Sequence, residues 1–209
     1  MDGNTVKFHA FHGSPPCCLA QATMDHLSVN YEFNEVVPMK DTKSEEFLKI
    51  NPKGKVPVVQ DGDFTIDESY AIARYFCRKA GDVSFYPSDA KKAAKIDALI
   101  DLDIQTFRGK MDPWKNEVLF APFFGGAEEP TAERKQELQK TIDEGFKIIA
   151  DQLEREGTDF LAGNEVTLAD FSFFFSTFYP CKMSDAKHDT HAKAKEWFDR
   201  VKGKAKLKF

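Results

Sequence analysis

The sequence lacks any long apolar run. No stretch is long enough to span a bilayer, and the opening residues MDGNTVKF lack the basic start and apolar core of a signal peptide. We therefore expect a cytoplasmic protein without a membrane partner.

Cysteine is also scarce, with only four among 209 residues. Four cysteines do not make a disulfide scaffold in a chain of this length, and a bridge between the neighbours Cys17 and Cys18 would be strained. Histidines such as His9 and His12 pair by spacing only, without a matching cluster of cysteines or carboxylates. We therefore expect no metal site and no bound cofactor.

Positive charge is not in excess. The chain has 29 Lys and Arg against 34 Asp and Glu, a net charge of -5, and no basic segment interleaves with aromatic residues. The sequence offers no general attraction to a phosphate backbone, so nucleic acid is not an expected partner.

The first part of the chain alternates between strand and helix patterns. Apolar residues recur at every second position in TVKFHAF, and Pro16 sits where a helix can begin, because its missing N–H is not needed there. Strands are predicted at residues 5–11, 29–37, 56–60 and 64–66, and helices from 16, at 43–50 and at 68–79. The last two strands form a hairpin around Asp61-Gly62-Asp63, giving the order βαβ then ββα.

The pattern changes at residues 81–90, GDVSFYPSDA, whose Gly, Pro and turn residues predict a linker. Beyond it, helices are predicted at 90–111, 132–156, 167–179 and 191–204. The segment 167–179 is apolar nearly all round, which is typical of a buried central helix. The fold class is therefore a small α/β domain, residues 1–82, followed by an all-helical domain, residues 91–209.

Five short motifs occur in one order along the chain: SPPC, NPKGKVPVV, DESYAI, LAGNEVTLADF and EWFDRV. Together they resemble the cytosolic glutathione transferases over essentially the whole chain. The resemblance implies a thioredoxin-like N-terminal domain that binds glutathione as co-substrate and a helical domain that shapes the pocket for an apolar electrophile. It also implies a homodimer with a role in detoxification.

Ser14 is the catalytic residue that the resemblance indicates. Glutathione reacts as a thiolate, and a hydroxyl donor beside the positive end of a helix can stabilise that anion. Tyrosine-using members carry their hydroxyl near the end of the first strand, where this chain has Phe8 and Phe11. The chain is thus similar to the serine-type classes theta, delta and phi. From the residues alone, Ser14 can equally be a helix N-cap.

Cys17 is the rival to Ser14. It matches the second cysteine of a thioredoxin-like C-x-x-C, a position that is usually covered, so Cys17 and Cys18 are expected to be packing residues. A reactive Cys17 would instead make the protein a glutathione-dependent reductase or peroxidase. A third alternative is a glutathione-binding module without catalysis.

The resemblance assigns Val56 and Pro57 to glutathione binding. It implies a cis peptide bond between them, which leaves the Val56 N–H and C=O able to pair with the backbone of the cysteinyl residue of glutathione. Without the resemblance, Pro57 would be an ordinary trans proline that starts an edge strand. Glu68 and Ser69 are assigned to the γ-glutamyl ammonium and carboxylate. Their alternative is a capped helix with an acid in its first turn.

Lys43 and Lys55 match positions where the phi-like pattern places residues for the glycyl carboxylate, and Lys53 competes with Lys55. Solvated lysines are the alternative. The delta-like pattern would have a histidine where this chain has Gly54, so the class stays open.

Two further features concern the helical half. Thr167 and Asp170 form a capping box that the family carries for folding. Aromatic candidates for the electrophile pocket, and acidic candidates on one helix for reaching toward glutathione in a partner subunit, are Trp114, Phe120, Phe123, Phe124, Phe175, Phe178, Tyr179, Asp97, Asp101 and Asp103.

Overall fold

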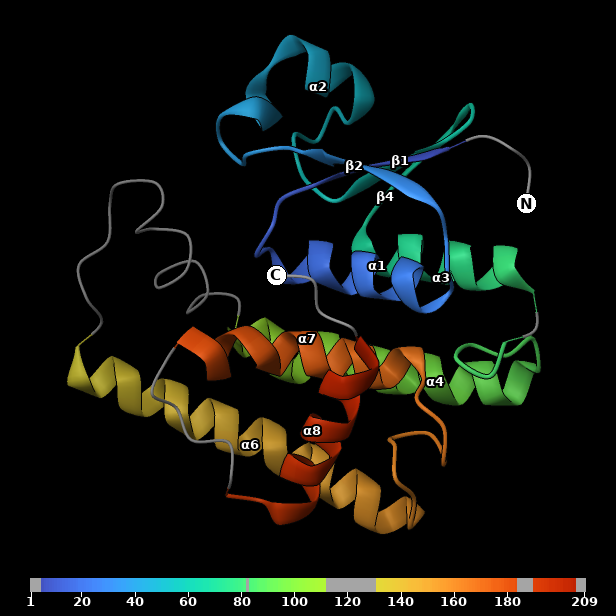
Figure 1. Ribbon diagram of the computed structural model, residues 1–209. Helices are drawn as coiled ribbons and strands as arrows, with labels where there is room; N and C mark the ends of the chain where they lie inside the picture. Colours follow the sequence, from blue (N-terminus) through green and yellow to red (C-terminus); the bar gives the residue numbers. More distant parts are fainter. Residues whose placement is uncertain (1–4, 82, 112–130, 184–189, 206–209) are drawn as a thin grey trace. The chain divides into compact units, whose positions relative to one another are not determined.

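The computed structural model describes residues 5–81, 83–111, 131–183 and 190–205, without the side chains of 179–183 (Figure 1). The chain divides into two compact units, and the division falls between Ser88 and Asp89. Among the helices described, none combines the length and apolar character that crossing a membrane requires.

The first unit is built on one four-stranded sheet. Its elements are β1 (Val6–Ala10), α1 (Pro15–His26), β2 (Tyr31–Glu35), the 3-10 turn η1 (Asp41–Lys43), α2 (Glu45–Ile50), β3 (Val58–Asp61), β4 (Phe64–Asp67) and α3 (Ser69–Ala80). The strand order is β2-β1-β3-β4, with β1 parallel to β2, and with the β1–β3 and β3–β4 pairs antiparallel. This βαβαββα arrangement confirms the predicted thioredoxin-like α/β domain.

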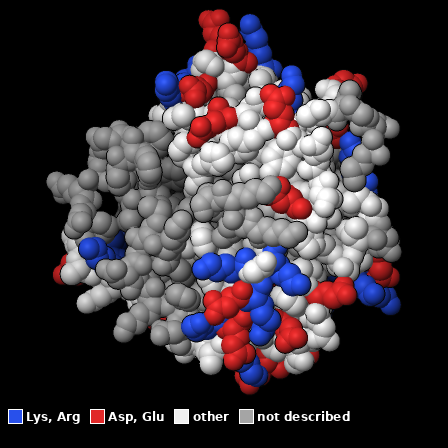
Figure 2. Space-filling model, in the orientation of Figure 1, with Lys and Arg blue, Asp and Glu red and all other residues white. Residues whose placement is uncertain are grey.

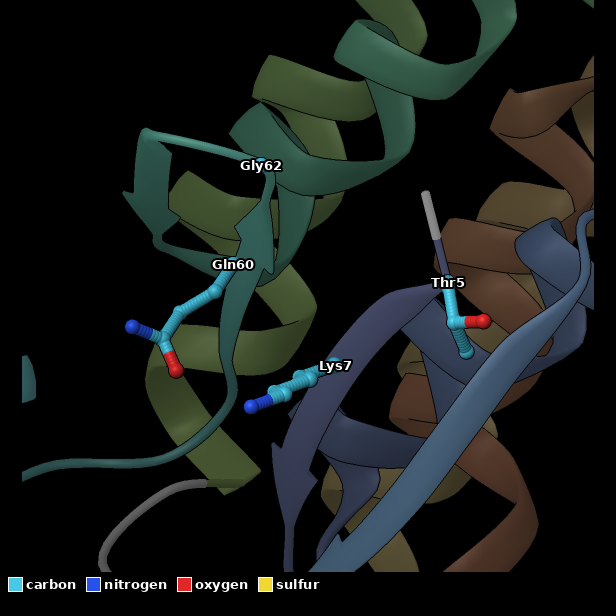
Figure 3. Close-up of a pocket in the computed structure, with 4 residues that line it drawn as sticks. All are labelled: Thr5, Lys7, Gln60 and Gly62. Atoms are coloured by element: carbon cyan, nitrogen blue, oxygen red, sulfur yellow. The ribbon is translucent and has the colours of Figure 1, made fainter. Parts of the chain in front are cut away.

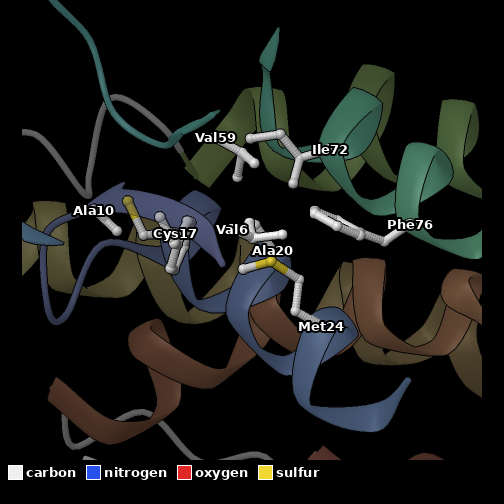
Figure 4. Close-up of a cluster of buried hydrophobic side chains, with 9 residues drawn as sticks. Val6, Ala10, Cys17, Ala20, Met24, Val59, Ile72 and Phe76 are labelled. Atoms are coloured by element: carbon white, nitrogen blue, oxygen red, sulfur yellow. The ribbon is translucent and has the colours of Figure 1, made fainter. Parts of the chain in front are cut away.

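Alternation along β1 determines which helices cover which face. Val6 and Ala10 point toward α1 and α3, where they pack with Met24, Ile72 and Phe76 in a buried cluster (Figure 4). Each fully buried side chain of the size of Ile72 or Phe76 contributes about 1.5–3 kcal/mol. The opposite face of the sheet carries α2 (Figure 1).

The turn between β3 and β4 is one residue shorter than predicted. Asp61 is the last residue of β3, so the turn consists of Gly62 and Asp63, with Gly62 at φ 64°. Such a tight hairpin needs a residue that tolerates positive φ, which glycine does without steric conflict.

The predicted linker packs against the first unit. Phe85 and Tyr86 are buried. The Phe85 ring lies 4.4 Å from that of His26, and the Arg78 guanidinium lies 5.8 Å from the Tyr86 ring. Gly and Pro in this segment correctly indicated a break between helices, but the two aromatic side chains give it apolar surface to bury.

The second unit is helical throughout its described elements, as predicted. These are α4 (Ala90–Leu102), a π-helical segment η2 (Asp103–Arg108), α6 (Ala132–Glu156), α7 (Leu168–Met183) and α8 (Ala192–Ala205). The π-helical segment was not predicted. Asp103 and Phe107 in this segment are buried, and the Asp103 carboxylate accepts hydrogen bonds from Ser172 (2.6 Å) and Ser176 (2.9 Å).

The predicted capping box joins three segments of the second unit. Asp170 accepts hydrogen bonds from the N–H and hydroxyl of Thr167, both at 2.8 Å. It also accepts from the Leu161 N–H at 2.9 Å and the Trp197 indole N–H at 2.8 Å. A fully buried carboxylate with four donors organises the start of α7, which supports the structural role expected of this motif.

Charged residues of both signs are intermixed on the surface. On the face in Figure 2, basic and acidic side chains lie beside one another in the lower part of the view. Pairs one helical turn apart include Lys147–Asp151 on α6 and Lys195–Asp199 on α8. Exposed pairs of this kind contribute little stability, about 0.3–0.5 kcal/mol each.

Candidate active site

Ser14 and the Val56–Pro57 peptide lie at the same end of the sheet. The chain leaves β1 at Ala10 and reaches Ser14 immediately before α1. Strand β3 is antiparallel to β1, with Val58 opposite His9, so the residues that precede β3 lie beside the C-terminal end of β1.

Glu68 and Ser69 join them through the next strand pair. Asp67, the last residue of β4, lies opposite Val58, the first residue of β3. The chain therefore leaves β4 at the end of the sheet where it enters β3, and Glu68 and Ser69 follow there. The register thus brings together three of the predicted motifs.

Ser14 occupies the N-cap position of α1, but its side chain makes no capping hydrogen bond. Pro15 and Pro16 occupy the first two positions of the helix and have no N–H to donate, so the Cys17 N–H is the one donor left for a cap, and the Ser14 hydroxyl does not accept from it. Ser14 is only 6% exposed, and its hydroxyl lies at the helix N-terminus without serving as a cap.

Cys17 lies one turn inside α1 and is 2% exposed. Burial raises the pKa of its thiol to about 12, although the Phe11 backbone N–H and the Ser14 hydroxyl lie within hydrogen-bonding reach of the sulfur and oppose the rise. Such a thiol stays protonated near neutral pH and is a poor nucleophile. Cys18 is buried as well, in agreement with the packing role predicted for both cysteines.

The Val56–Pro57 peptide bond is cis, as predicted. Val56 precedes β3 rather than belonging to it. Across the part of the chain that the structure describes, no residue hydrogen-bonds to the Val56 N–H or C=O. These two groups therefore remain able to pair with an extended ligand backbone.

Glu68 has an unusual backbone conformation at the start of α3, with φ 68° and ψ 115°. A non-glycine residue in such a region costs about 1–3 kcal/mol, and residues of this kind cluster at functional sites. The Glu68 side chain is 71% exposed and does not cap α3. Ser69, the first residue of the helix, is buried at 4% exposure.

Lys53 was the alternative to Lys55 for binding the glycyl carboxylate, but the structure pairs it with two acidic residues. Its ammonium lies 2.8 Å from an Asp67 carboxylate oxygen and 3.7 Å from Glu68. The hydrogen bond to Asp67 raises the pKa of Lys53. Lys53 is therefore engaged by the acidic residues ahead of α3, and Asp67 is a site residue that the sequence reasoning did not single out, although it opens the DESYAI motif.

Lys43 and Lys55 are exposed and, among the described residues, form no ion pair. Their segments approach closely at Gly54, where an added Cβ would lie 3.0 Å from the Thr42 carbonyl oxygen. The close approach places η1 next to the loop that carries Lys55. The assignment of both lysines to a carboxylate stays a prediction.

A separate hollow of about 240 Å³ opens on the sheet and contains none of the predicted site residues. It is lined by Thr5, Lys7, Gln60 and Gly62 (Figure 3). Lys7 and Gln60 extend from neighbouring strands, and the side-chain oxygen Oε1 of Gln60 lies 2.9 Å from His9 Nε2. The hollow has a polar surface, unlike a pocket for an apolar substrate.

The aromatic candidates for the electrophile pocket fall into two groups. Phe175 and Phe178 belong to the core: the Phe174 ring lies 5.2 Å from Phe175 and 5.3 Å from Phe178, and both candidates are buried. The other five lie outside the residues or side chains that the structure describes: Trp114, Phe120, Phe123, Phe124 and Tyr179.

Asp103 is also excluded from the role of reaching toward a partner subunit. Its side chain is fully buried and is bound by two serines of α7. Asp103 follows the buried residues Ile96, Leu99 and Ile100 at helical spacing, so it lies on the interior face of this stretch. Asp97 and Asp101 lie on α4, and their role stays untested.

Comparison with known proteins adds independent findings. The family model described as the glutathione S-transferase N-terminal domain matches residues 8–84, and the model of the C-terminal domain matches residues 114–209. Glutathione S-transferase 1 of Manduca sexta is 30% identical over 93% of this chain and 87% of its own length. A probable elongation factor 1-gamma 2 of Arabidopsis thaliana is 34% identical over 79% of this chain but only 38% of its own length.

A solved structure shows the same architecture. The crystal structure of a glutathione transferase homolog from Drosophila mojavensis with bound glutathione has a TM-score of 0.81 and is 27% identical, covering 98% of this chain and 89% of that one.

Proposed function

The chain belongs to the glutathione S-transferase family, and from this premise we propose that it conjugates the thiolate of glutathione to apolar electrophiles, with Ser14 as the catalytic residue. The observation that carries the proposal is that Ser14, a buried residue, stands at the N-terminus of α1 without using its hydroxyl to cap the helix. Its position at the N-terminus of α1 suits a donor to an anionic sulfur.

The energetic demand on this site is modest. Lowering the pKa of a thiol from about 8.5 to about 6.5 requires near 2.7 kcal/mol of additional stabilisation of the thiolate. A hydrogen bond to a charged group contributes about 1.5–3 kcal/mol and a helix N-terminus about 0.3–1 kcal/mol. The Ser14 hydroxyl and α1 together therefore have the required magnitude.

Binding of glutathione is divided among the neighbouring segments. The Val56 N–H and C=O pair with the cysteinyl backbone ahead of Pro57. Ser69, at the start of α3, takes the γ-glutamyl carboxylate, and Glu68 takes the ammonium. Lys43 and Lys55 take the glycyl carboxylate.

The chemical step is a nucleophilic substitution or addition. The thiol proton passes to solvent, the sulfur lone pair forms a bond to the electrophilic carbon, and a leaving group, where there is one, departs with its bonding electrons. In this proposal residues 1–82 bind glutathione, residues 91–209 bind the electrophile, and the working unit is a homodimer. Neither the loss of the thiol proton nor the formation of the sulfur–carbon bond requires a metal or a further cofactor.

Specific observations bear on the two alternative functions. The buried, protonated Cys17 argues against a reductase or peroxidase that uses this thiol. The likeness to an elongation factor 1-gamma favours a second candidate, a glutathione-binding module without turnover. Calorimetric titration with glutathione, alongside a conjugation assay, distinguishes the two, because the module binds glutathione and produces no conjugate.

Ser14→Ala tests the catalytic assignment. We expect kcat/KM for conjugation to an activated aryl halide to fall by about 10- to 100-fold near neutral pH, which corresponds to one to two pKa units of the bound thiol. The pH profile should move upward while glutathione affinity stays near that of the unsubstituted protein. Ser84→Ala, at an exposed position, is the matched control. Coincident profiles for Ser14→Ala and the unsubstituted protein would exclude Ser14 as the thiolate-stabilising residue.

A further inference from the structure

Three charged side chains meet beside the start of α3: Lys53, Asp67 and Glu68. The Lys53 ammonium lies 2.8 Å from Asp67 Oδ2 and donates a hydrogen bond of 3.1 Å to Asp67 Oδ1, so it engages both carboxylate oxygens. It lies 3.7 Å from Glu68 Oε1, which is beyond hydrogen-bonding distance. Lys53 therefore compensates the charge of Asp67 closely and leaves the Glu68 carboxylate, which is 71% exposed, able to bind a ligand.

The loop that carries Lys53 is held in place by hydrogen bonds of the buried Asn51. The Asn51 side chain accepts from the Lys53 N–H at 3.1 Å and donates to the Lys55 carbonyl at 2.8 Å. The Asn51 carbonyl accepts from the N–H of Gly54 at 2.9 Å, and Gly54 has the positive φ of 60° that glycine tolerates. The loop thus places Lys53 beside Asp67 without relying on the exposed ion pair, which by itself contributes little stability.

We propose that Lys53 is a specificity-determining residue that matches the site to a zwitterionic γ-glutamyl group. The inference rests on the proposed function, in which Glu68 takes the ligand ammonium and Ser69 takes the adjacent carboxylate. Asp67 and Glu68 carry two negative charges, whereas this end of the ligand has one charge of each sign. With Lys53 bound to Asp67, a single negative charge faces the ligand, and the γ-glutamyl carboxylate is not repelled by a second one.

The distances allow Lys53 to act on the ligand through its charge. An ammonium that hydrogen-bonds to a carboxylate oxygen lies about 2.7–2.9 Å from it, so a ligand ammonium on Glu68 Oε1 lies within about 7 Å of the Lys53 ammonium. This separation is shorter than the Debye length of about 8 Å at physiological ionic strength. One unit charge at this distance changes the affinity for a charged group by about threefold, even with the dielectric constant of water.

Calorimetric titration with two ligands tests the proposal. The ligands are glutathione and glutaryl-cysteinyl-glycine, the analogue in which hydrogen replaces the γ-glutamyl amino group. The Kd of the analogue divided by the Kd of glutathione measures selectivity for the ammonium, because contributions from the rest of the ligand cancel.

We expect Lys53→Gln to raise this ratio about threefold, because Asp67 is then uncompensated, and Asp67→Asn to lower it about threefold. The double substitution removes one charge of each sign and should restore the ratio of the unsubstituted protein. Lys53→Arg keeps the charge and should keep the ratio. The Lys53 and Asp67 side chains are 56% and 26% exposed, so neither substitution opens a cavity in the core.

Lys7→Gln is the matched control, because it removes the same charge from an exposed position of the same unit. Strand β3 separates Lys7 on β1 from Asp67 on β4, and two strand spacings amount to about 10 Å. The ratio should stay unchanged in this variant. The inference is overturned by an unchanged ratio in Lys53→Gln, by a double substitution whose ratio stays as high as that of Lys53→Gln, or by an equal rise in Lys7→Gln.

Failure of the proposed function gives a different result. If the unsubstituted protein binds both ligands equally, or if Glu68→Gln leaves the ratio unchanged, Glu68 does not take the ammonium, and this part of the proposed function fails together with the inference. If Glu68→Gln lowers the ratio while Lys53→Gln and Asp67→Asn leave it in place, only the inference fails.

Discussion

At the scale of single residues, two side chains of the candidate site stand at helix N-caps but make no capping hydrogen bond. Ser14 stands at the N-cap of α1, and its hydroxyl makes no capping hydrogen bond. Glu68 stands at the N-cap of α3 without capping it, in a backbone conformation with positive φ. Both features lower local stability, which is typical of positions retained for function.

Glu68→Gly should separate stability from binding. Glycine relieves the positive φ, so we expect the free energy of unfolding to increase by up to about 1 kcal/mol. Loss of the carboxylate should weaken glutathione binding by about tenfold. Ser28→Gly, at another exposed position with positive φ (56°), should give a similar gain in stability and unchanged affinity. Urea unfolding and calorimetric titration measure the two effects, and unchanged affinity in Glu68→Gly would contradict the role of Glu68.

At the scale of elements, the main departure from the sequence pattern is the π-helical segment after α4. Helical periodicity over residues 90–111 predicts one continuous helix, whereas residues 103–108 are π-helical and the buried Asp103 carboxylate accepts hydrogen bonds from Ser172 and Ser176 of α7. Another close contact follows from it: Phe107, in the same segment, packs directly on Gly145 of α6.

Gly145→Ala should destabilise the protein although alanine is the better helix former. A Cβ at Gly145 would lie 2.2 Å from two atoms of the ring of Phe107, which is buried, so the ring would have to shift. We expect overpacking to cost about 1–3 kcal/mol, offset by at most about 1 kcal/mol of helix propensity. Gly203→Ala, in α8 with open space around it, should instead stabilise by about 0.5–1 kcal/mol. Equal effects of the two substitutions in chemical denaturation would refute the contact.

At the scale of the whole molecule, the buried thiols make stability depend on alkaline pH. Burial raises the pKa values of Cys17 and Cys77 from 9.0 to about 12. Because the native state holds both protons more tightly, this contribution is complete below about pH 9 and is lost as pH rises toward about 12. The fall amounts to about 1.4 kcal/mol per pH unit for each thiol.

Cys77→Ala tests this dependence without touching the site. We expect the variant to be less stable near pH 8 but to lose stability less steeply at higher pH, by about 1.4 kcal/mol per unit. Urea unfolding under reducing conditions, at several pH values between about 8 and 10.5, measures the slope. Parallel slopes for the variant and the unsubstituted protein would show that Cys77 ionises equally in both states.

The sequence by itself determined the order of strands and helices, the break near residues 81–90, the family, and the absence of N–H groups next to Ser14. These depend on local periodicity, on proline chemistry and on motifs read in order. Only the tertiary structure decided the protonation of Cys17, the engagement of Lys53 by Asp67, the packing of Phe85 and the hydrogen bond between Asp103 and Ser172. Each of these depends on desolvation or on contacts between residues distant in the chain, and a pattern along the sequence carries no information about such distances.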